Sequence, residues 1–169
     1  MASKRALARA LGLGAVAGMR SLAAPAILSR QAARAGAPGG AWSNGLDFDR
    51  TGFQWLGRPF YATVLSLLAA GEASGDKVKG APKRTRALSL AVRAASGALV
   101  GGAIFAGEDE PPALGALFGA GAAISMTFLA YAIRKRIAQS GRVNDKALGL
   151  GEDLLVAALG AGLLRKSAR

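Results

Sequence analysis

Residues 11–28 read LGLGAVAGMRSLAAPAIL, an apolar run of membrane-spanning length with a single charge, Arg20, near its middle. About 20 consecutive apolar residues in a helix are enough to cross the hydrocarbon core of a bilayer. A charged side chain at that depth costs about 2.5–3.5 kcal/mol on insertion scales, so it needs a partner or a watery cavity. The stretch therefore predicts a membrane span over residues 7–28, with a polar site around Arg20 and Ser21.

The composition of the whole chain is also typical of a membrane protein. Of its 169 residues, 51% are hydrophobic and 24 are glycine, and the mean hydropathy is positive. The net charge of +12 comes from basic residues between apolar runs, where they orient a membrane protein and contact anionic lipid head groups. We therefore expect membrane lipids as partners, rather than nucleic acid, and a single integral membrane domain over residues 1–169.

Two residue types are missing from the chain, which has no cysteine and no histidine. Their absence excludes disulfides, thiolate and iron–sulfur chemistry, zinc or haem ligation by histidine, and histidine general bases. We expect no metal, no cofactor and no catalytic residues, so the predicted protein is not an enzyme.

The N-terminal stretch is also compatible with a targeting segment. Residues 1–46 contain no acid, and the basic side chains before the apolar run are Lys4, Arg5 and Arg9. A signal peptide cleaved near residues 24–26, or an arginine-rich transit peptide, has this character. Because Arg20 and Pro25 interrupt the apolar region, we favour a retained span.

Apolar runs predict an all-α membrane fold. The expected spans are 7–28, 59–76, 88–107, 114–133 and 146–164, with an interfacial loop over 30–58. Small residues in the third and fourth spans suit close helix packing, so we expect Gly97, Gly101 and Gly119 to face other helices. Basic loops predict that the N-terminus and residues 77–86 lie in the cytoplasm, opposite the acidic turn at residues 108–110.

Acidic side chains inside the apolar runs are the candidate partners of Arg20, and they are Glu72, Glu152 and Asp153. Intramembrane ionisable residues commonly line the path of a substrate or ion, so a transporter- or channel-like protein is the leading hypothesis. An internal salt bridge that only fixes helix packing explains the same residues. A loose similarity of residues 68–72 to 148–152 favours an inverted repeat, as found in transporters, although low complexity also accounts for it.

Two other functions stay open. Small size and glycine- or alanine-rich faces also suit an accessory or scaffold subunit of a larger membrane complex, or a homo-oligomer. An enzyme acting on a lipid phosphate is less favoured, since no nucleophile–base pair and no metal cluster is evident. The side chains expected at the interface, in reach of lipid phosphates, are Asp76, Lys77, Arg84, Thr85 and Arg93.

Several short motifs follow one another along the chain. They are Gly18-Met19-Arg20-Ser21, Ala24-Pro25-Ala26, Gly71-Glu72, Gly75-Asp76-Lys77, Pro82-Lys83-Arg84-Thr85, Arg93 with Ser96-Gly97-Ala98-Leu99, and Glu152-Asp153. As an ordered set they resemble the small bacterial membrane proteins of the domain of unknown function 4126 family. The resemblance covers nearly the whole chain and implies a multi-pass protein of the bacterial inner membrane, without an assigned activity.

Overall fold

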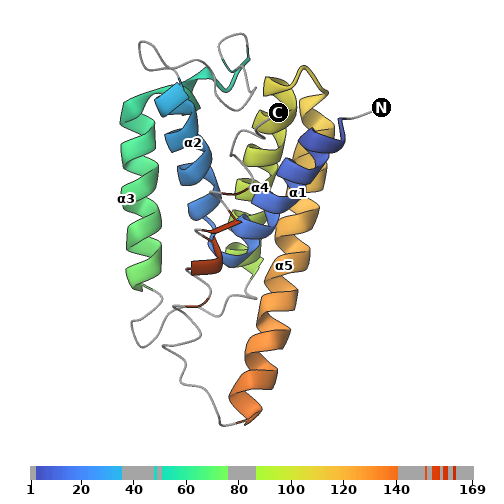
Figure 1. Ribbon diagram of the computed structural model, residues 1–169. Helices are drawn as coiled ribbons and strands as arrows, with labels where there is room; N and C mark the ends of the chain where they lie inside the picture. The colour runs from blue at the N-terminus through green and yellow to red at the C-terminus, as the bar shows by residue number, and fades with distance from the viewer. Residues whose placement is uncertain are drawn as a thin grey trace.

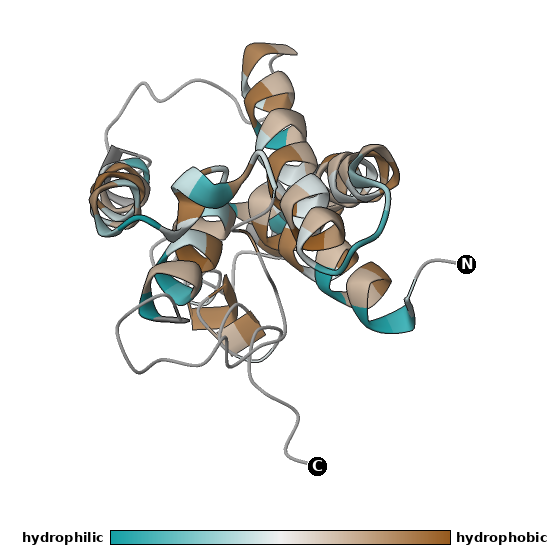
Figure 2. Ribbon diagram, turned by 90° about the horizontal axis from the view of Figure 1, so that it is seen from above, coloured by the Kyte–Doolittle hydropathy of each residue, from teal (hydrophilic) through white to brown (hydrophobic). Residues whose placement is uncertain are grey.

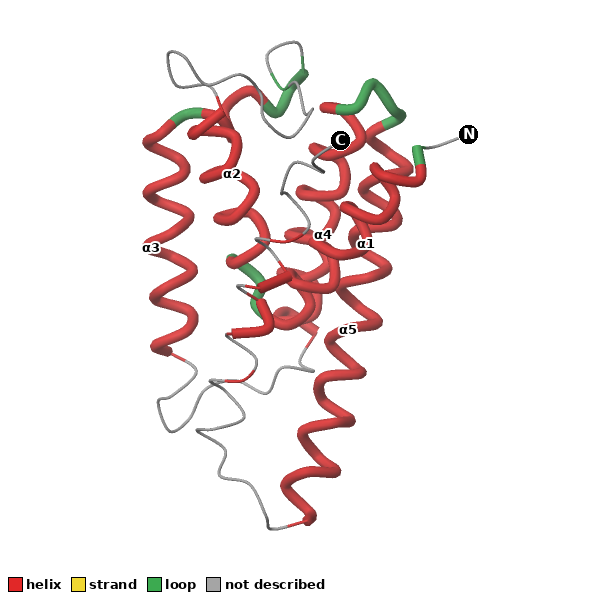
Figure 3. The backbone as a smooth tube through the Cα atoms, viewed as in Figure 1, coloured by secondary structure: helices red, strands yellow, loops and turns green. Residues whose placement is uncertain are grey.

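The computed structural model describes residues 3–35, 48, 51–75 and 87–140 and, near the C-terminal end, residues 151, 154–156, 158–159 and 162. These parts of the chain are helical and contain no strand (Figures 1 and 3), so the predicted all-α class is confirmed. The helices are α1 (Lys4–Met19), α2 (Ala23–Ala35), the 3-10 helix η1 (Gln54–Gly57), α3 (Pro59–Gly75), α4 (Ala87–Gly107) and α5 (Pro112–Ser140).

The stretch 7–28 forms two helices, so the single span predicted from its hydropathy is wrong. α1 ends at Met19, Arg20 is extended with φ −137° and ψ 107°, and α2 begins at Ala23. Pro25 explains the break, because in a continuous helix its ring clashes with the carbonyl of Ser21 and it has no N–H to donate there. In the first turn of α2 that N–H is not needed. The chain therefore reverses direction after Arg20, and α2 continues into the region expected to be a loop.

The helices form two groups. α1, α4 and α5 pack on one another, while α2 packs on α3 and η1; α2 also contacts α1 and α4 and so joins the groups. α3 lies at the left edge of the molecule both in Figure 1 and from above in Figure 2, with α2 between it and the other group. Within the described residues, α3 therefore contacts the rest of the protein mainly through α2 and η1.

Glycines let α4 and α5 approach closely. A Cβ atom added to Gly101 would meet the carbonyl oxygen of Gly115, and one added to Gly119 would meet the carbonyl oxygen of Gly97. Neither position has room for a side chain unless the backbone moves. The prediction that Gly97, Gly101 and Gly119 face other helices is therefore confirmed.

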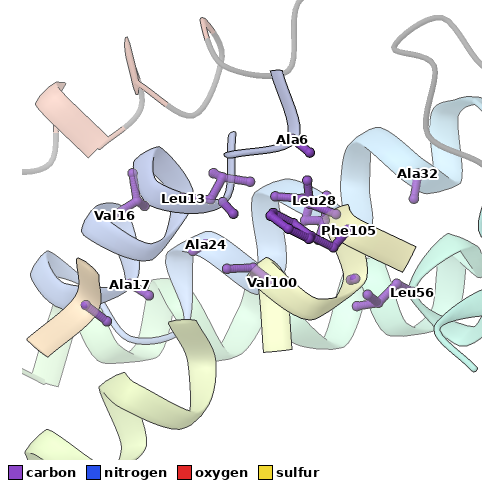
Figure 4. Packing of buried hydrophobic residues seen from close by; sticks show 14 of the residues in the cluster. Ala6, Leu13, Val16, Ala17, Ala24, Leu28, Ala32, Leu56, Val100 and Phe105 are labelled. Carbon is purple, nitrogen blue, oxygen red and sulfur yellow. The ribbon is translucent and has the colours of Figure 1, made fainter. Parts of the chain in front are cut away.

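Apolar side chains from several helices meet in one core (Figure 4). Leu28 of α2, Phe105 of α4 and Leu56 of η1 are fully buried there. The hydroxyl of Ser29 donates a hydrogen bond to the Leu56 carbonyl oxygen at 2.6 Å, and Phe48 is also buried. The expected interfacial loop is thus held to the core by Phe48 and Leu56.

The N-terminus lies against the acidic turn between α4 and α5. The backbone N–H of Ser3 donates to a Glu110 carboxylate oxygen at 2.9 Å, and Arg9 forms an ion pair with Glu108 at 2.8 Å. The prediction that the N-terminus lies opposite this turn is therefore wrong. Because the chain reverses after Arg20, it runs along the bundle once more than predicted. The N-terminus and the acidic turn therefore lie at the same end of the bundle, whereas α3 ends and α4 begins at the other end (Figure 1).

Two of the described helices are long and apolar enough to cross a membrane, residues 87–107 and 112–137. They coincide with the expected spans 88–107 and 114–133. The expected span 59–76 corresponds to α3, which has 17 residues. The expected span 146–164 lies mostly outside the described residues, although Val156 is buried in the core.

Candidate polar site at the helix break

Glu72, near the end of α3, reaches across to the break between α1 and α2. Its Oε1 accepts hydrogen bonds from the backbone N–H of Ser21 at 2.9 Å and from the Ser21 hydroxyl at 2.5 Å. Its Oε2 accepts one from the backbone N–H of Leu22 at 2.9 Å. N–H groups at the start of a helix have no partner within that helix, and the helix dipole favours a negative charge beside them. Glu72 therefore caps α2 from a different helix.

Arg20 comes directly before the two residues that Glu72 binds. It is 4% exposed, so its charge lies inside the protein. Its backbone N–H closes the last turn of α1 by donating to the Val16 carbonyl oxygen at 2.9 Å. The break thus combines a buried cation, a hydroxyl and two backbone amides that donate to one carboxylate.

Thr127 of α5 fixes the end of α1 beside this break. Its hydroxyl lies 3.1 Å from the Gly18 carbonyl oxygen and 2.8 Å from the Ala123 carbonyl oxygen. Thr127 precedes Ile133, the last apolar residue before a basic triplet, by about 9 Å along the helix axis at 1.5 Å per residue. The polar site is therefore nearer to that end of α5 than to its start.

The other predicted site residues fall into two groups. Arg93, expected at the lipid interface, is 4% exposed within α4, and Ser96 beside it is also buried. The remaining predicted site residues lie outside the described part of the chain: Asp76, Lys77, Arg84, Thr85, Glu152 and Asp153. The structure therefore brings together Arg20, Ser21 and Glu72 from the predicted set.

One partly buried ion pair was not predicted from the sequence. The side chains of Arg9 and Glu108 are 4% and 12% exposed. They lie 99 positions apart in the sequence, so no local pattern connects them. The three consecutive acids at residues 108–110 were the only signal, and the expected single span placed them away from Arg9.

The chemistry available at the break is proton and anion chemistry. A carboxylate that shares a hydrogen bond with a hydroxyl can take up and pass on a proton. The backbone N–H groups of Ser21 and Leu22 are the kind of donors that bind anions at helix starts, and here the anion that they bind is the Glu72 carboxylate. In the described residues, no three acidic side chains are grouped as a metal ion would require.

The comparisons with known proteins identify a family and no activity. A family model described as a domain of unknown function (DUF4126) matches residues 7–163. No curated protein and no solved structure matches the chain. The matched region includes the helix break and Glu72, and it covers all but the two ends of the sequence. The chain therefore belongs to the domain of unknown function 4126 family.

Proposed function

We propose that this is a multi-pass integral membrane protein of a bacterial inner membrane, with its helices lying across the bilayer. The side chains of the described residues support this, because buried arginines occur together with exposed large apolar side chains. Arg9, Arg20 and Arg93 are buried, whereas large apolar side chains such as Phe60 and Leu67 of α3 are 69% and 68% exposed. Water makes such exposure costly, and hydrocarbon does not.

α5 gives the clearest support for a bilayer. Only 22% of its most apolar window is buried, unlike the core helix of a soluble protein. The residues from Pro112 to Ile133 carry no charge and rise by about 32 Å, close to the hydrocarbon thickness of a bilayer. The two ends of this segment thus define the two membrane faces.

The charges at these two faces support one orientation. The turn at residues 108–110 is acidic, whereas the sequence between α3 and α4 contains Lys77, Lys79, Lys83, Arg84 and Arg86, and residues 134–136 are all basic. Basic residues favour the cytoplasmic side. We therefore place the acidic turn and the N-terminus outside the cytoplasm.

Within this frame we propose a transporter- or channel-like activity in which Glu72 carries protons at the helix break. The observation that carries the proposal is the contact of the Glu72 carboxylate with Ser21 and Leu22, at a reversal of the chain beside buried Arg20. A membrane-embedded helix break is stable only when protein groups or a cavity satisfy its backbone. Protonation of Glu72 removes the charge that holds the break together, so proton uptake and opening of the break are coupled.

Proton flux into vesicles tests the activity. The protein is reconstituted into liposomes that contain a pH-sensitive dye, and a potassium diffusion potential drives protons inward. Wild-type protein should acidify the vesicles faster than protein-free membranes, and Glu72→Gln should abolish the difference. Glu110→Gln is the matched control, because it neutralises a carboxylate at the far end of the bundle. Wild-type vesicles no faster than protein-free ones, or equal rates for Glu72→Gln and wild type, would contradict a proton path through Glu72.

An accessory subunit of a larger membrane complex is the alternative, and α3 is the observation that favours it. α3 packs mainly on α2 and η1, which leaves Phe60, Leu67 and Leu68 exposed. Native mass spectrometry of protein released from its own membranes separates the two proposals. A complex of fixed stoichiometry with another polypeptide supports the accessory role, whereas a monomer or homo-oligomer that conducts protons supports the first proposal.

A further inference from the structure

The exposed end of α5 has the layout of a phospholipid binding surface. Lys135 and Arg136 are exposed, and only Arg134 separates them from the apolar part of the helix. α5 continues past the ends of α3 and α4 in Figure 1, so the C-terminal end of this helix stands clear of the rest of the described bundle. A cation in this position has no competing carboxylate on its own helix, since α5 contains no Asp or Glu.

Helix periodicity connects each of these cations to an exposed apolar row. Residues three, four and seven positions earlier lie on the same face of a helix. Tyr131 and Phe128 therefore lie on the same face of α5 as Lys135, and both side chains are about half exposed. In the same way Ile133 and Leu129 lie on the same face as Arg136, and both side chains are about half exposed. An acyl chain that lies along either row contacts apolar side chains, and the cation at the end of the row is then beside its phosphate.

We propose that these two rows bind anionic phospholipids of the leaflet at this end, with the acyl chains along α5 and the phosphates on Lys135 and Arg136. The proposal rests on the membrane placement of α5 argued above. Tyr131 supports the assignment to a lipid, because tyrosine is enriched at the level of the head groups, one turn from where the phosphates would lie. A soluble anion has no use for the apolar rows.

The other end of the bundle offers a contrast within the same molecule. Lys4 and Arg5 are also an adjacent, exposed basic pair. They lie at the start of α1, where Ser3 and Arg9 are bound to the carboxylates of Glu110 and Glu108. These acids repel a lipid phosphate, so the end with Lys4 and Arg5 should not prefer anionic lipid. Two basic pairs of equal formal charge are thus expected to behave differently.

Thermal unfolding of the full chain in a neutral detergent, titrated with lipid, tests the proposal. Phosphatidylglycerol should stabilise wild-type protein at lower concentrations than phosphatidylcholine with the same acyl chains. The double variant Lys135→Gln/Arg136→Gln should lose this preference. Each cation near an anionic lipid surface is worth about a fivefold change in affinity, so the apparent affinity for phosphatidylglycerol should fall about thirtyfold. Lys4→Gln/Arg5→Gln should retain it.

The possible results separate the proposal from the placement that it rests on. Equal effects of the two lipids on wild type, or an equal loss in both double variants, overturn the lipid site but leave the membrane placement intact. A wild-type protein that stays folded and monomeric without detergent, and responds to neither lipid, overturns the membrane placement itself. If inorganic phosphate stabilises the protein as well as phosphatidylglycerol does, the apolar rows play no part and the site is not a lipid site.

Discussion

Glu72 of α3 binds both the hydroxyl and the backbone amide of Ser21, where the chain reverses between α1 and α2. The contact joins two residues that are 51 positions apart in the sequence and links α3 to the turn after α1. Hydrogen bonds to a charged group contribute about 1.5–3 kcal/mol. Ser21→Ala should therefore lower the free energy of unfolding by about that amount, measured in detergent.

Ser66→Ala is the matched control for Ser21→Ala. The Ser66 hydroxyl donates to the Ala62 carbonyl oxygen of its own helix at 2.6 Å, so its loss breaks no contact between helices. Exposed or locally bonded hydroxyls change stability by only a few tenths of a kcal/mol as a rule. The double variant Ser21→Ala/Glu72→Ala should lose less free energy of unfolding than the two single variants lose together. If these costs simply add, Glu72 does not act through Ser21.

The glycines of α5 give a second prediction within one helix. Gly119→Ala should destabilise the protein, because the new Cβ would meet the Gly97 carbonyl oxygen and force α4 and α5 apart. Overpacking of this kind costs about 1–3 kcal/mol or more. Gly121→Ala should be neutral or stabilising by up to about 1 kcal/mol, since its added Cβ would meet no atom within 4 Å beyond the neighbouring backbone of its own helix. Equal melting temperatures for the two variants would show that α5 does not pack on α4 through this face.

The partly buried pair of Arg9 and Glu108 leads to a third prediction. Removing one member of a fully buried ion pair costs about 3–5 kcal/mol, because the other charge is left without compensation, and the cost here should be smaller because the Glu108 side chain is 12% exposed. Glu108→Gln should therefore destabilise the protein, and adding Arg9→Met should restore part of the loss. Asp109→Asn removes a charge from the same turn, and asparagine tolerates the positive φ of 56° found there. If Asp109→Asn lowers the free energy of unfolding as much as Glu108→Gln does, then the total charge of the turn matters and the ion pair with Arg9 does not.

The parts of the fold predicted from sequence are those set by local pattern. The apolar runs of α4 and α5 located both helices, and their glycines indicated a close contact, because length and small side chains act within one helix. Pro25 carried the signal for the helix break, yet the hydropathy of residues 7–28 concealed it, since each side of the break is apolar by itself. A single missed reversal then placed the N-terminus at the wrong end.

The candidate site was predicted only in part, for a physical reason. Arg20 and Glu72 stood out as charges in apolar runs, and such charges need partners. The groups that Glu72 binds include the backbone amides of Ser21 and Leu22, and every residue except proline has such an amide. No side-chain pattern can mark them, so only the positions of the helices in space identify the capped break.

The most direct test concerns the reversal at Arg20, on which both the site and the topology depend. Single cysteines are introduced at Lys4 and Arg30, which are exposed near the far ends of α1 and α2, and at Asp109 and Lys135 as markers of the two faces. A thiol reagent that cannot cross the membrane is added to intact cells. The cysteines at positions 4, 30 and 109 should be labelled and the one at position 135 should not. Labelling of positions 4 and 30 from opposite sides would show that residues 7–28 cross the membrane once, and would contradict the helix break that Glu72 caps.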